Sequence, residues 1–484
     1  MKTTLKLSAI FFLLSTLVFA ACGGGSNSKS GGTAPETPEP LIADANLEAR
    51  IRAQLPTPIP ASQQLTKADL ETLTDLNANG YGLPDEQKIS SISGFEHCIN
   101  LTGLDLGYNR IADISSLAGL SDLESLELYE NQVSSVSALS GLTALQYLGL
   151  SVNQISDISA LSGLIAMKEL FLGGNTINNI SALSGLTAME TLYLGDNQIS
   201  SISVISGLTV LRRLDLAINQ ITDINALSGL TLLENIDLYG NQISDISPLS
   251  GLTVLNRLRI SSNQIADISA LAGLTNLNTL ELTGNQISDI NTLSALTSLD
   301  SLYIGSNLIS NIDVLSGITA LRRLSLDRNQ IADISALAGM TTLERLSAYG
   351  NQIIDISALS GLSNINFIDL GNNQIVDIGA LSGLTALTII YLDNNDIVDI
   401  SALSGLSVLQ YLRINGNEIV NISPLQNLTL LANLNLRNNS ITDITALINN
   451  TGLGTGDAVD LRTNPLTDPA QVETLRAKGV TVTY

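Results

Sequence analysis

The sequence has very few of the residues that carry most enzyme chemistry. It contains one histidine, two cysteines and no tryptophan in 484 residues, and only 14% of the chain is charged. His97 adjoins Cys98, and neighbours in an extended segment point to opposite sides, so we expect two packing residues. No phosphate-binding loop, zinc-ligand spacing or nucleophile elbow occurs. We therefore expect no enzyme activity, no cofactor and no metal site.

Positive charge is also scarce. The chain has 22 Lys and Arg against 45 Asp and Glu, a formal net charge of -23. Such a surface repels nucleic acid and anionic lipid head groups, so neither is expected as a partner. With Cys22 and Cys98 as the only thiols, no disulfide framework is expected to support the fold.

The only long apolar run lies at the amino terminus. Lys2 and Lys6 precede an apolar stretch that ends before Cys22 and is too short to span a membrane, which predicts a secretory signal. Small residues directly before a Cys, with Gly and Ser after it, resemble the lipobox of bacterial lipoproteins, although Phe19 replaces the usual Leu. A plain secretory signal is the alternative.

The lipobox resemblance implies that residues 1–21 are a signal peptide, that Cys22 is lipidated, and that residues 22–40 form a flexible tether. In enteric bacterial lipoproteins, an Asp directly after the lipidated Cys implies retention in the inner membrane. Gly23 stands there in this sequence, which favours the outer membrane. We expect a cell-envelope protein held at the membrane by this lipid anchor only.

From residue 101 to 446 the chain repeats every 22 residues, with an Asn in register sixteen times from Asn109 to Asn439. Apolar residues recur eight, five and three positions before each Asn and two, five, eight and eleven after it. The first part alternates as a strand does, and the second steps by three, as 3₁₀ or extended turns do. One strand and one return segment predict one coil of a solenoid, which is stable only when stacked and capped.

Both caps are visible in the sequence. In residues 41–100, Leu47, Ile51 and Leu55 predict a helix ended by a proline, and Thr66 to Asp69 predict a capping box before an irregular first repeat. In residues 447–484, a late repeat around Asn464 precedes a predicted helix that Gly479 ends, and then a last strand.

The pattern LxxLxLxxNxIxxIxxLxxL resembles the bacterial leucine-rich repeats of the internalins. The resemblance implies an α/β solenoid, a horseshoe with a parallel concave β-sheet and a 3₁₀ or extended convex side. It also implies a helical amino-terminal cap and a strand-helix-strand carboxyl-terminal cap. In that family the concave surface holds a partner, which differs between members.

The constant polar positions have structural explanations. We expect each repeated Asn to turn its amide inward toward backbone groups of its own and the neighbouring coil. The Asp four residues later occurs in eleven of sixteen repeats, and a stack of carboxylates could collect cations. Since Asn or Ser replaces it elsewhere, turn capping explains this column better. Ser six after the Asn, such as Ser115, is also expected to cap the turn.

Function is expected where the repeats differ. Residues six, four and two before the Asn face the concave side, and those flanking the Asn lie at its rim. Eleven of the fourteen aromatics beyond residue 21 and nine of fifteen arginines fall there, and such residues dominate contact energies. The candidate partner-binding residues are Tyr108, Tyr129, Tyr147, Phe171, Tyr193, Arg213, Tyr239, Arg257, Arg259, Tyr303, Arg323, Arg328, Arg345, Tyr349, Phe367, Tyr391, Tyr411 and Arg413.

The sequence therefore predicts a monomeric surface scaffold, of adhesin, receptor or assembly type, that holds a protein on its concave face. Early coils offer acids beside aromatics and the middle coils offer Arg257 and Arg259, so a partner with separated charges fits best. Carbohydrate binding by the tyrosine rings and a purely structural spacer remain alternatives. Charge reversal at these two arginines against alanine at Tyr193 and Tyr303 separates the three.

Overall fold

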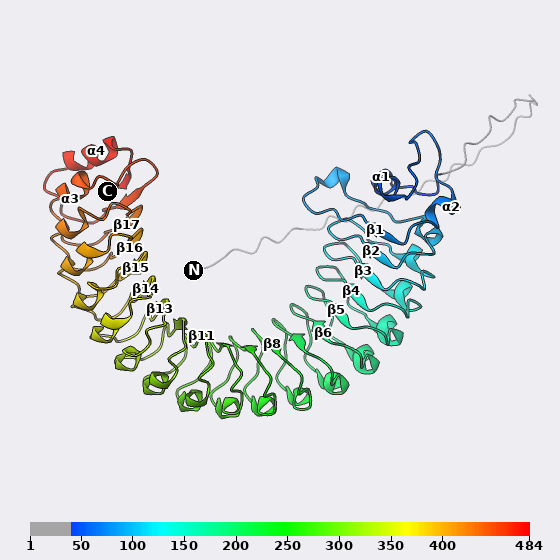
Figure 1. Ribbon diagram of the computed structural model, residues 1–484, viewed down its shortest axis with the longest axis horizontal. Helices are drawn as coiled ribbons and strands as arrows, with labels where there is room; N and C mark the ends of the chain where they lie inside the picture. Colours follow the sequence, from blue (N-terminus) through cyan, green and yellow to red (C-terminus); the bar gives the residue numbers. More distant parts are fainter. Residues whose placement is uncertain (1–39) are drawn as a thin grey trace, which may run out of the picture. The chain divides into compact units, whose positions relative to one another are not determined.

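A computed structural model describes residues 40–484, and Leu41–Tyr484 form one compact unit. In this unit every strand pairs in parallel with the next along the chain, so 19 three-residue strands form one open sheet on the inner side of a curved stack of coils (Figure 1). The unit carries its own core and a cap at each end, so residues 41–484 can fold without the preceding segment.

The strands are all three residues long. Their bounds are β1 Asp75–Asn77, β2 Gly103–Asp105, β3 Ser125–Glu127, β4 Tyr147–Gly149, β5 Glu169–Phe171, β6 Thr191–Tyr193, β7 Arg213–Asp215, β8 Asn235–Asp237, β9 Arg257–Arg259, β10 Thr279–Glu281, β11 Ser301–Tyr303, β12 Arg323–Ser325, β13 Arg345–Ser347, β14 Phe367–Asp369, β15 Ile389–Tyr391, β16 Tyr411–Arg413, β17 Asn433–Asn435, β18 Ala458–Asp460 and β19 Thr481–Thr483.

Short 3₁₀ helices line the outer side of the coils and confirm the step of three in the sequence. They are η1 Asp85–Gln87, η2 Phe95–His97, η3 Ser115–Leu117, η4 Ser137–Leu139, η5 Ser159–Gly163, η6 Ser181–Gly185, η7 Ser203–Gly207, η8 Asn225–Leu227, η9 Ser247–Leu249, η10 Ser269–Leu271, η11 Asn291–Ala295, η12 Asp313–Gly317, η13 Ser335–Leu337, η14 Ser357–Gly361, η15 Gly379–Leu381, η16 Ser401–Gly405 and η17 Ser423–Leu425.

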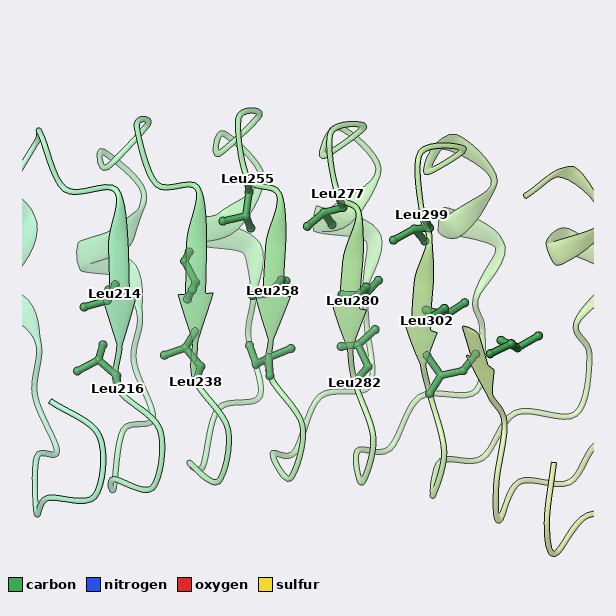
Figure 2. Close-up of a cluster of buried hydrophobic side chains, with 14 of the residues drawn as sticks. Leu214, Leu216, Leu238, Leu255, Leu258, Leu277, Leu280, Leu282, Leu299 and Leu302 are labelled. Carbon is green, nitrogen blue, oxygen red and sulfur yellow. The ribbon is translucent and has the colours of Figure 1, made fainter. Parts of the chain in front are cut away.

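The core runs without interruption through the stack. Figure 2 shows the strand leucines of successive coils in parallel rows. Leu255, Leu277 and Leu299 form one row, and Leu258, Leu280 and Leu302 form the next. The seven apolar positions predicted around each Asn are buried; in the coil of Asn153 they are at most 1% exposed. Because each row continues into the next coil, no coil has an independent core.

The repeated Asn joins each coil to the one before it, as predicted. Asn263 Nδ2 donates to the carbonyl oxygens of Ile260 in its own coil (3.2 Å) and Leu238 in the preceding coil (3.0 Å). Its Oδ1 accepts the backbone N–H of Ile243, also in the preceding coil, at 3.0 Å. These buried bonds recur along the stack, so the column is a ladder that satisfies backbone groups where the strand turns outward.

The residue before each Asn adopts a left-handed backbone conformation. Glycine occupies this position in five repeats, but Val152 (φ 57°) and Ile218 (φ 53°) are β-branched there. Left-handed backbone brings Cβ close to the following carbonyl oxygen, which makes this conformation unfavourable for such residues. Both side chains are about half exposed, at 53% and 51%.

The Asp after the ladder caps the outer turn. Asp267 Oδ1 accepts the backbone N–H of Ser269 at 2.8 Å, and Asn179 accepts that of Ser181 in the same way at 3.0 Å. The capping interpretation of this column is therefore confirmed. The prediction that Ser115, Ser159 and Ser401 cap the turn is wrong, because each begins a 3₁₀ helix whose preceding Ile makes no side-chain cap bond.

Both caps follow the sequence prediction, with one omission. At the front are α1 (Ala45–Gln54) and α2 (Lys67–Leu70), the latter with the predicted capping box. At the far end, β18 precedes α4 (Ala470–Ala477) and β19. The omission is α3 (Thr445–Asn449), an α-helical turn in place of a 3₁₀ turn, followed by the fully buried Asn450. The side chain of that Asn donates to the carbonyls of Leu425 and Leu428, both at 3.0 Å.

His97 and Cys98 lie in and after η2, so the expectation of an extended segment was wrong there. Cys98 is fully buried, and this burial, with Glu96 nearby, raises the pKa of its thiol to about 12. It therefore packs as a core residue. Within residues 40–484 no helix is long and apolar enough to cross a membrane. The predicted signal peptide, Cys22 and the tether up to residue 39 lie outside the described residues.

Candidate binding face

The predicted binding residues lie along the inner sheet in successive coils. Most begin or end a strand, on either side of its buried central residue, as Arg257 and Arg259 do in β9. The others follow a strand by two or three residues: Tyr108, Tyr129, Tyr239, Arg328 and Tyr349. None of the eighteen is buried. The structure brings neighbours in adjacent coils together, but it spreads the whole set along the sheet rather than around one pocket.

At the amino-terminal end, tyrosine rings stack edge to face. The centroids of Tyr108 and Tyr129 lie 4.9 Å apart, and Tyr81 lies 4.9 Å from Tyr108. The Tyr129 hydroxyl accepts a hydrogen bond from Asn79 Nδ2 at 2.9 Å. The sequence did not point to Tyr81 because it belongs to the irregular first coil, outside the 22-residue register; the residue is 74% exposed.

A second aromatic row crosses β4, β5 and β6. The ring centroids of Tyr147 and Phe171 are 5.3 Å apart, and those of Phe171 and Tyr193 are 5.0 Å apart. Burial raises the pKa of Glu127 above its ordinary value, and repulsion from the nearby Asp105 raises it further. The hydrogen bond that Glu127 accepts from Tyr147 lowers this pKa, but by less. Burial and that same hydrogen bond also raise the pKa of the Tyr147 hydroxyl.

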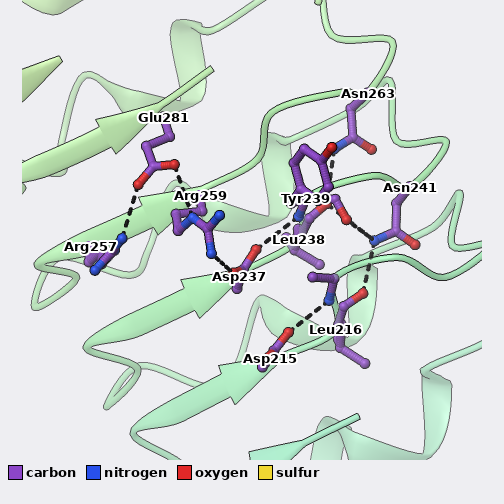
Figure 3. Close-up of polar contacts among 11 residues, drawn as sticks. Asp215, Leu216, Asp237, Leu238, Tyr239, Asn241, Arg257, Arg259, Asn263 and Glu281 are labelled. Carbon is purple, nitrogen blue, oxygen red and sulfur yellow. Dashed lines mark hydrogen bonds and ion pairs between the residues drawn. The ribbon is translucent and has the colours of Figure 1, made fainter. Parts of the chain in front are cut away.

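In the middle of the sheet, arginines and acids form an internal network (Figure 3). Arg259 pairs with Asp237 and, through Nε, with Glu281 at 2.9 Å; Arg257 pairs with the other oxygen of Glu281 at 3.0 Å. The two arginines are therefore neutralised within the face, which the sequence does not show. Arg213 is exposed and has no ion-pair partner among residues 40–484.

A shallow depression of about 340 Å³ lies beside this network, lined by Tyr193, Arg213, Asp215, Asp237, Arg257 and their neighbours. Burial raises the pKa of Asp215, and repulsion from Asp237 raises it further. The hydrogen bond that its carboxylate accepts from the backbone N–H of Ala217 lowers the pKa and opposes both. This carboxylate forms no ion pair within the part of the chain that the structure describes.

Toward the carboxyl-terminal end, arginines lie over aromatic rings. The Arg345 guanidinium is 4.0 Å from the Phe367 ring centroid, and that of Arg413 is 4.8 Å from the Tyr391 centroid. Arg413 also pairs with Asp393 at 3.5 Å. Burial, with Asp327 and Asp393 nearby, raises the pKa of Asp369 to about 6.

Two further features bear on chemistry. Among residues 40–484, no three His, Cys, Asp or Glu side chains are grouped so that they could hold a metal ion. The depressions on the concave face are shallow and open, and their walls are the mixed Arg, Asp and Tyr side chains described above. Such a surface suits contact with an extended partner better than enclosure of a small molecule.

Comparison with known families and structures agrees with this geometry. The family model described as leucine-rich repeats in two copies matches residues 165–207, 209–251, 253–295, 297–339, 341–383 and 364–405, and a second leucine-rich repeat model matches residues 99–155. An internalin of Listeria monocytogenes is 33% identical and superposes with a TM-score of 0.62 over 76% of this chain and 100% of its own. The chain belongs to the leucine-rich repeat family.

Other leucine-rich repeat structures share the fold at lower identity. A protein of Leptospira interrogans is 22% identical, with a TM-score of 0.63 over 86% of this chain and 97% of its own. The Arabidopsis receptor kinase HAESA, solved with the peptide hormone IDA and the co-receptor SERK1, is 18% identical, with a TM-score of 0.62 over 88% and 80%. No curated protein matches the sequence.

Family membership confirms the predicted fold and the general class of function. The open parallel sheet with 3₁₀ turns is that of a leucine-rich repeat horseshoe. Leucine-rich repeat proteins are generally protein-interaction scaffolds and typically are not enzymes.

Proposed function

We propose that this chain is a surface lipoprotein, anchored through Cys22, whose concave face binds a protein partner. The likeness to an internalin and to a receptor ectodomain supports an extracellular or surface position. HAESA, with the same fold, holds a peptide hormone and a co-receptor. The chemistry of the residues on the concave face indicates what kind of partner this chain binds.

The observation that carries the proposal is a set of three carboxylates on the concave face, those of Glu127, Asp215 and Asp369. Each has a raised pKa because it is partly buried near another acid, and in Asp215 and Asp369 these causes outweigh the attraction of Arg259 and Arg413. None of the three forms an ion pair at contact distance within residues 40–484. A cation from outside would offset both the cost of burial and the repulsion by its attraction to the ionised carboxylate. The partner therefore presents cationic groups along the sheet, with apolar surface for the aromatic rows.

Capture experiments with residues 41–484 test this proposal. The face variant combines Glu127→Gln, Asp215→Asn and Asp369→Asn, which remove three charges with little change of shape. The matched turn variant combines Asp157→Asn, Asp223→Asn and Asp267→Asn, which also remove three charges, and Asn179 already caps such a turn. Wild type and turn variant should recover the same protein from the cell envelope, and the face variant should lose it.

The alternatives give other results in the same experiment. A glycan ligand should survive the face variant and respond to Tyr193→Ala, because stacking on rings needs no carboxylate. If the turn variant loses the partner as fully as the face variant does, net charge and not the concave face is responsible. If no variant changes what is recovered, the chain is a spacer.

The anchor has a separate test. Replacing Cys22 by Ser in the full chain should move the protein from the membrane fraction to the soluble fraction, because no described helix can span a membrane. It should also abolish a mass increase that corresponds to acyl chains. Membrane retention of the variant without acylation would contradict the lipid anchor.

A further inference from the structure

One column outside the concave face changes character in four successive coils. The third residue after the Asn is Ala, Ser, Thr or Asn in twelve repeats but Ile354, Val376, Val398 and Val420 in the coils of Asn351 to Asn417. These four, the flank stripe, are 58%, 54%, 49% and 51% exposed. They lie between each strand and the following 3₁₀ helix, in the yellow to orange part of the arc in Figure 1. Four aligned β-branched side chains form a continuous apolar row in water.

A groove opens beside this row. A hollow of about 390 Å³ lies between the coils of Ile354 and Val376 and is also lined by Gly379. That glycine replaces the Ser, Asn, Asp or Thr that begins the outer turn in the fifteen other repeats, so a polar side chain is missing from the wall. The equivalent hollow between the coils of Ser200 and Asp223 measures about 220 Å³ and has Ser200 where the larger hollow has Ile354. Spaces between coils are thus general, but this one is larger and has the exposed side chains of Ile354 and Val376 at its edge.

Carboxylates border the flank stripe on both sides. The turn acids Asp355, Asp377 and Asp399 follow it, and each accepts a backbone N–H two residues on, which fixes the carboxylate beside the stripe. On the other side, Asp396 and Glu418 stand where most repeats have Gln. The four segments from the Asn to the end of the outer turn, residues 351–362, 373–384, 395–406 and 417–428, contain no Lys, Arg or His.

An apolar row bordered by carboxylates favours some binding partners over others. A second copy of the same face would place acids against acids, and an anionic membrane would be repelled in the same way. Successive strands lie about 4.8 Å apart and the coils separate further toward the outer side, which is close to the 5.4 Å rise of one α-helical turn. An extended strand repeats its side chains at about 6.6 Å and fits the row less well.

We propose that the flank stripe docks a cationic amphipathic helix of a partner protein. Apolar side chains at helical spacing rest on Ile354, Val376, Val398 and Val420, one turn to a coil. Lys or Arg side chains on both edges of the helix reach the two rows of carboxylates. The stripe lies beyond the ends of the strands, so this docking is independent of the concave face.

The test uses residues 41–484 and a fluorescent peptide of about four helical turns, with Leu on one face and Lys on the other. Its binding is measured by fluorescence anisotropy. The apolar variant changes Ile354, Val376, Val398 and Val420 to Ser, the residue that Ser156, Ser200 and Ser244 provide in sister coils. The charge variant combines Asp396→Gln and Glu418→Gln, which restores the usual residue of that column.

Wild type should bind the peptide with an affinity that falls as salt is added. The apolar variant should bind about tenfold more weakly or worse, and the charge variant several-fold more weakly with a flatter salt dependence. Both variants should unfold at the wild-type denaturant midpoint, because sister coils tolerate the same residues. The face variant with Glu127→Gln, Asp215→Asn and Asp369→Asn should bind the peptide as wild type does.

Four results would overturn the proposal. The apolar variant binding as tightly as wild type would show attraction to a generally acidic surface. Equal binding of a peptide with Glu in place of Lys would remove the role of the carboxylates. A wild-type dimer that becomes monomeric in the apolar variant would assign the stripe to self-association. Binding of wild type, but not of the apolar variant, to phosphatidylcholine vesicles would assign it to lipid.

Discussion

The turn carboxylates and the face carboxylates of this solenoid are the same chemical group in opposite situations. Asp267, in a turn, accepts a backbone N–H at 2.8 Å, and that bond holds its pKa below the ordinary value of 3.8. Asp369, on the concave face, is partly buried near two other acids, and its pKa rises to about 6. Turn acids are therefore stabilised within the fold, whereas face acids are held in a surrounding that disfavours their charge.

The same difference in how polar groups are paired distinguishes the repeated turn of each coil from its variable face. In the repeated turn, each polar group has a partner supplied by the backbone, as the Asn263 amide shows with its bonds to the carbonyls of Leu238 and Ile260. On the variable face, some polar groups are paired with one another, as Arg259 and Asp237 are, whereas others, such as Arg213, form no ion pair among residues 40–484. Unfavourable placement of this kind is concentrated where proteins bind, and here it coincides with the variable positions.

The largest effect is expected from breaking the ladder. Asn263→Ala leaves several buried backbone groups unpaired, at about 1–3 kcal/mol each, so unfolding should require about 3 kcal/mol less. Urea denaturation measures the change. Gln264→Ala, at the exposed neighbouring position, is the control and should stay within about 0.5 kcal/mol of wild type. Equal midpoints for the two variants would mean that the amide is not structural.

A smaller effect, of opposite sign, is expected at Ile218. Replacing this left-handed β-branched residue with Asn, which the column carries at Asn372 and Asn394, should stabilise the protein by about 1 kcal/mol. Thermal unfolding measures it. Ile165→Asn is the control, since that exposed Ile is not left-handed, and no gain is expected there. A lower melting temperature for Ile218→Asn would show that the Ile contacts outweigh the strain.

The face acid should respond to pH in its own window. The folded pKa of Asp369 is above its ordinary value of 3.8, so the folded state binds more protons between pH 3.8 and about 6, and stability is lost as pH rises through that range. Asp369→Asn removes this loss. The variant should be more stable than wild type at pH 7 and should differ less at pH 4. A variant that is less stable than wild type at pH 7 would contradict the account.

The turn acid should show the reverse dependence, with the smallest effect. The lowered pKa of Asp267 means that its contribution is present above about pH 4 and is lost as pH falls through the folded pKa. Asp267→Ala should lower the denaturation midpoint slightly at pH 7 and not at the lowest pH at which the protein stays folded. Asp267→Asn keeps an acceptor in the cap but removes the charge, so its midpoint at pH 7 should lie between those of wild type and Asp267→Ala.

Most of the frame could be predicted from the sequence, because its physical causes repeat every 22 residues. The core rows, the Asn ladder, the Asp turn caps and both end caps follow from periodicity and short-range hydrogen bonding. The Ser cap prediction failed because Ser115 is the first residue of the 3₁₀ helix and not the residue before it. Asp113, two residues earlier, accepts the backbone N–H of that Ser. Helix α3 and the buried Asn450 were missed because they occur once, after the register ends.

The position of the candidate residues on the sheet was predictable, but their pairing was not. The concave location of Arg257 and Arg259 follows from strand alternation, but their neutralisation by Asp237 and Glu281 depends on which residues the neighbouring coils bring alongside. The flank stripe was visible in the sequence as four successive β-branched residues in one column. Its exposure and the hollow beside it depend on the fold, because exposed and buried β-branched residues look alike in the sequence.

Carboxyl footprinting of residues 41–484, alone and with the captured partner, tests the separation of frame and face most directly. A water-soluble carbodiimide with an amine modifies accessible carboxylates, and mass spectrometry locates each one. On binding, modification of Glu127, Asp215 and Asp369 should fall, while that of the turn acids Asp157, Asp223 and Asp267 should stay the same. Protection of these turn acids with unchanged modification of the three face acids would contradict a concave binding face.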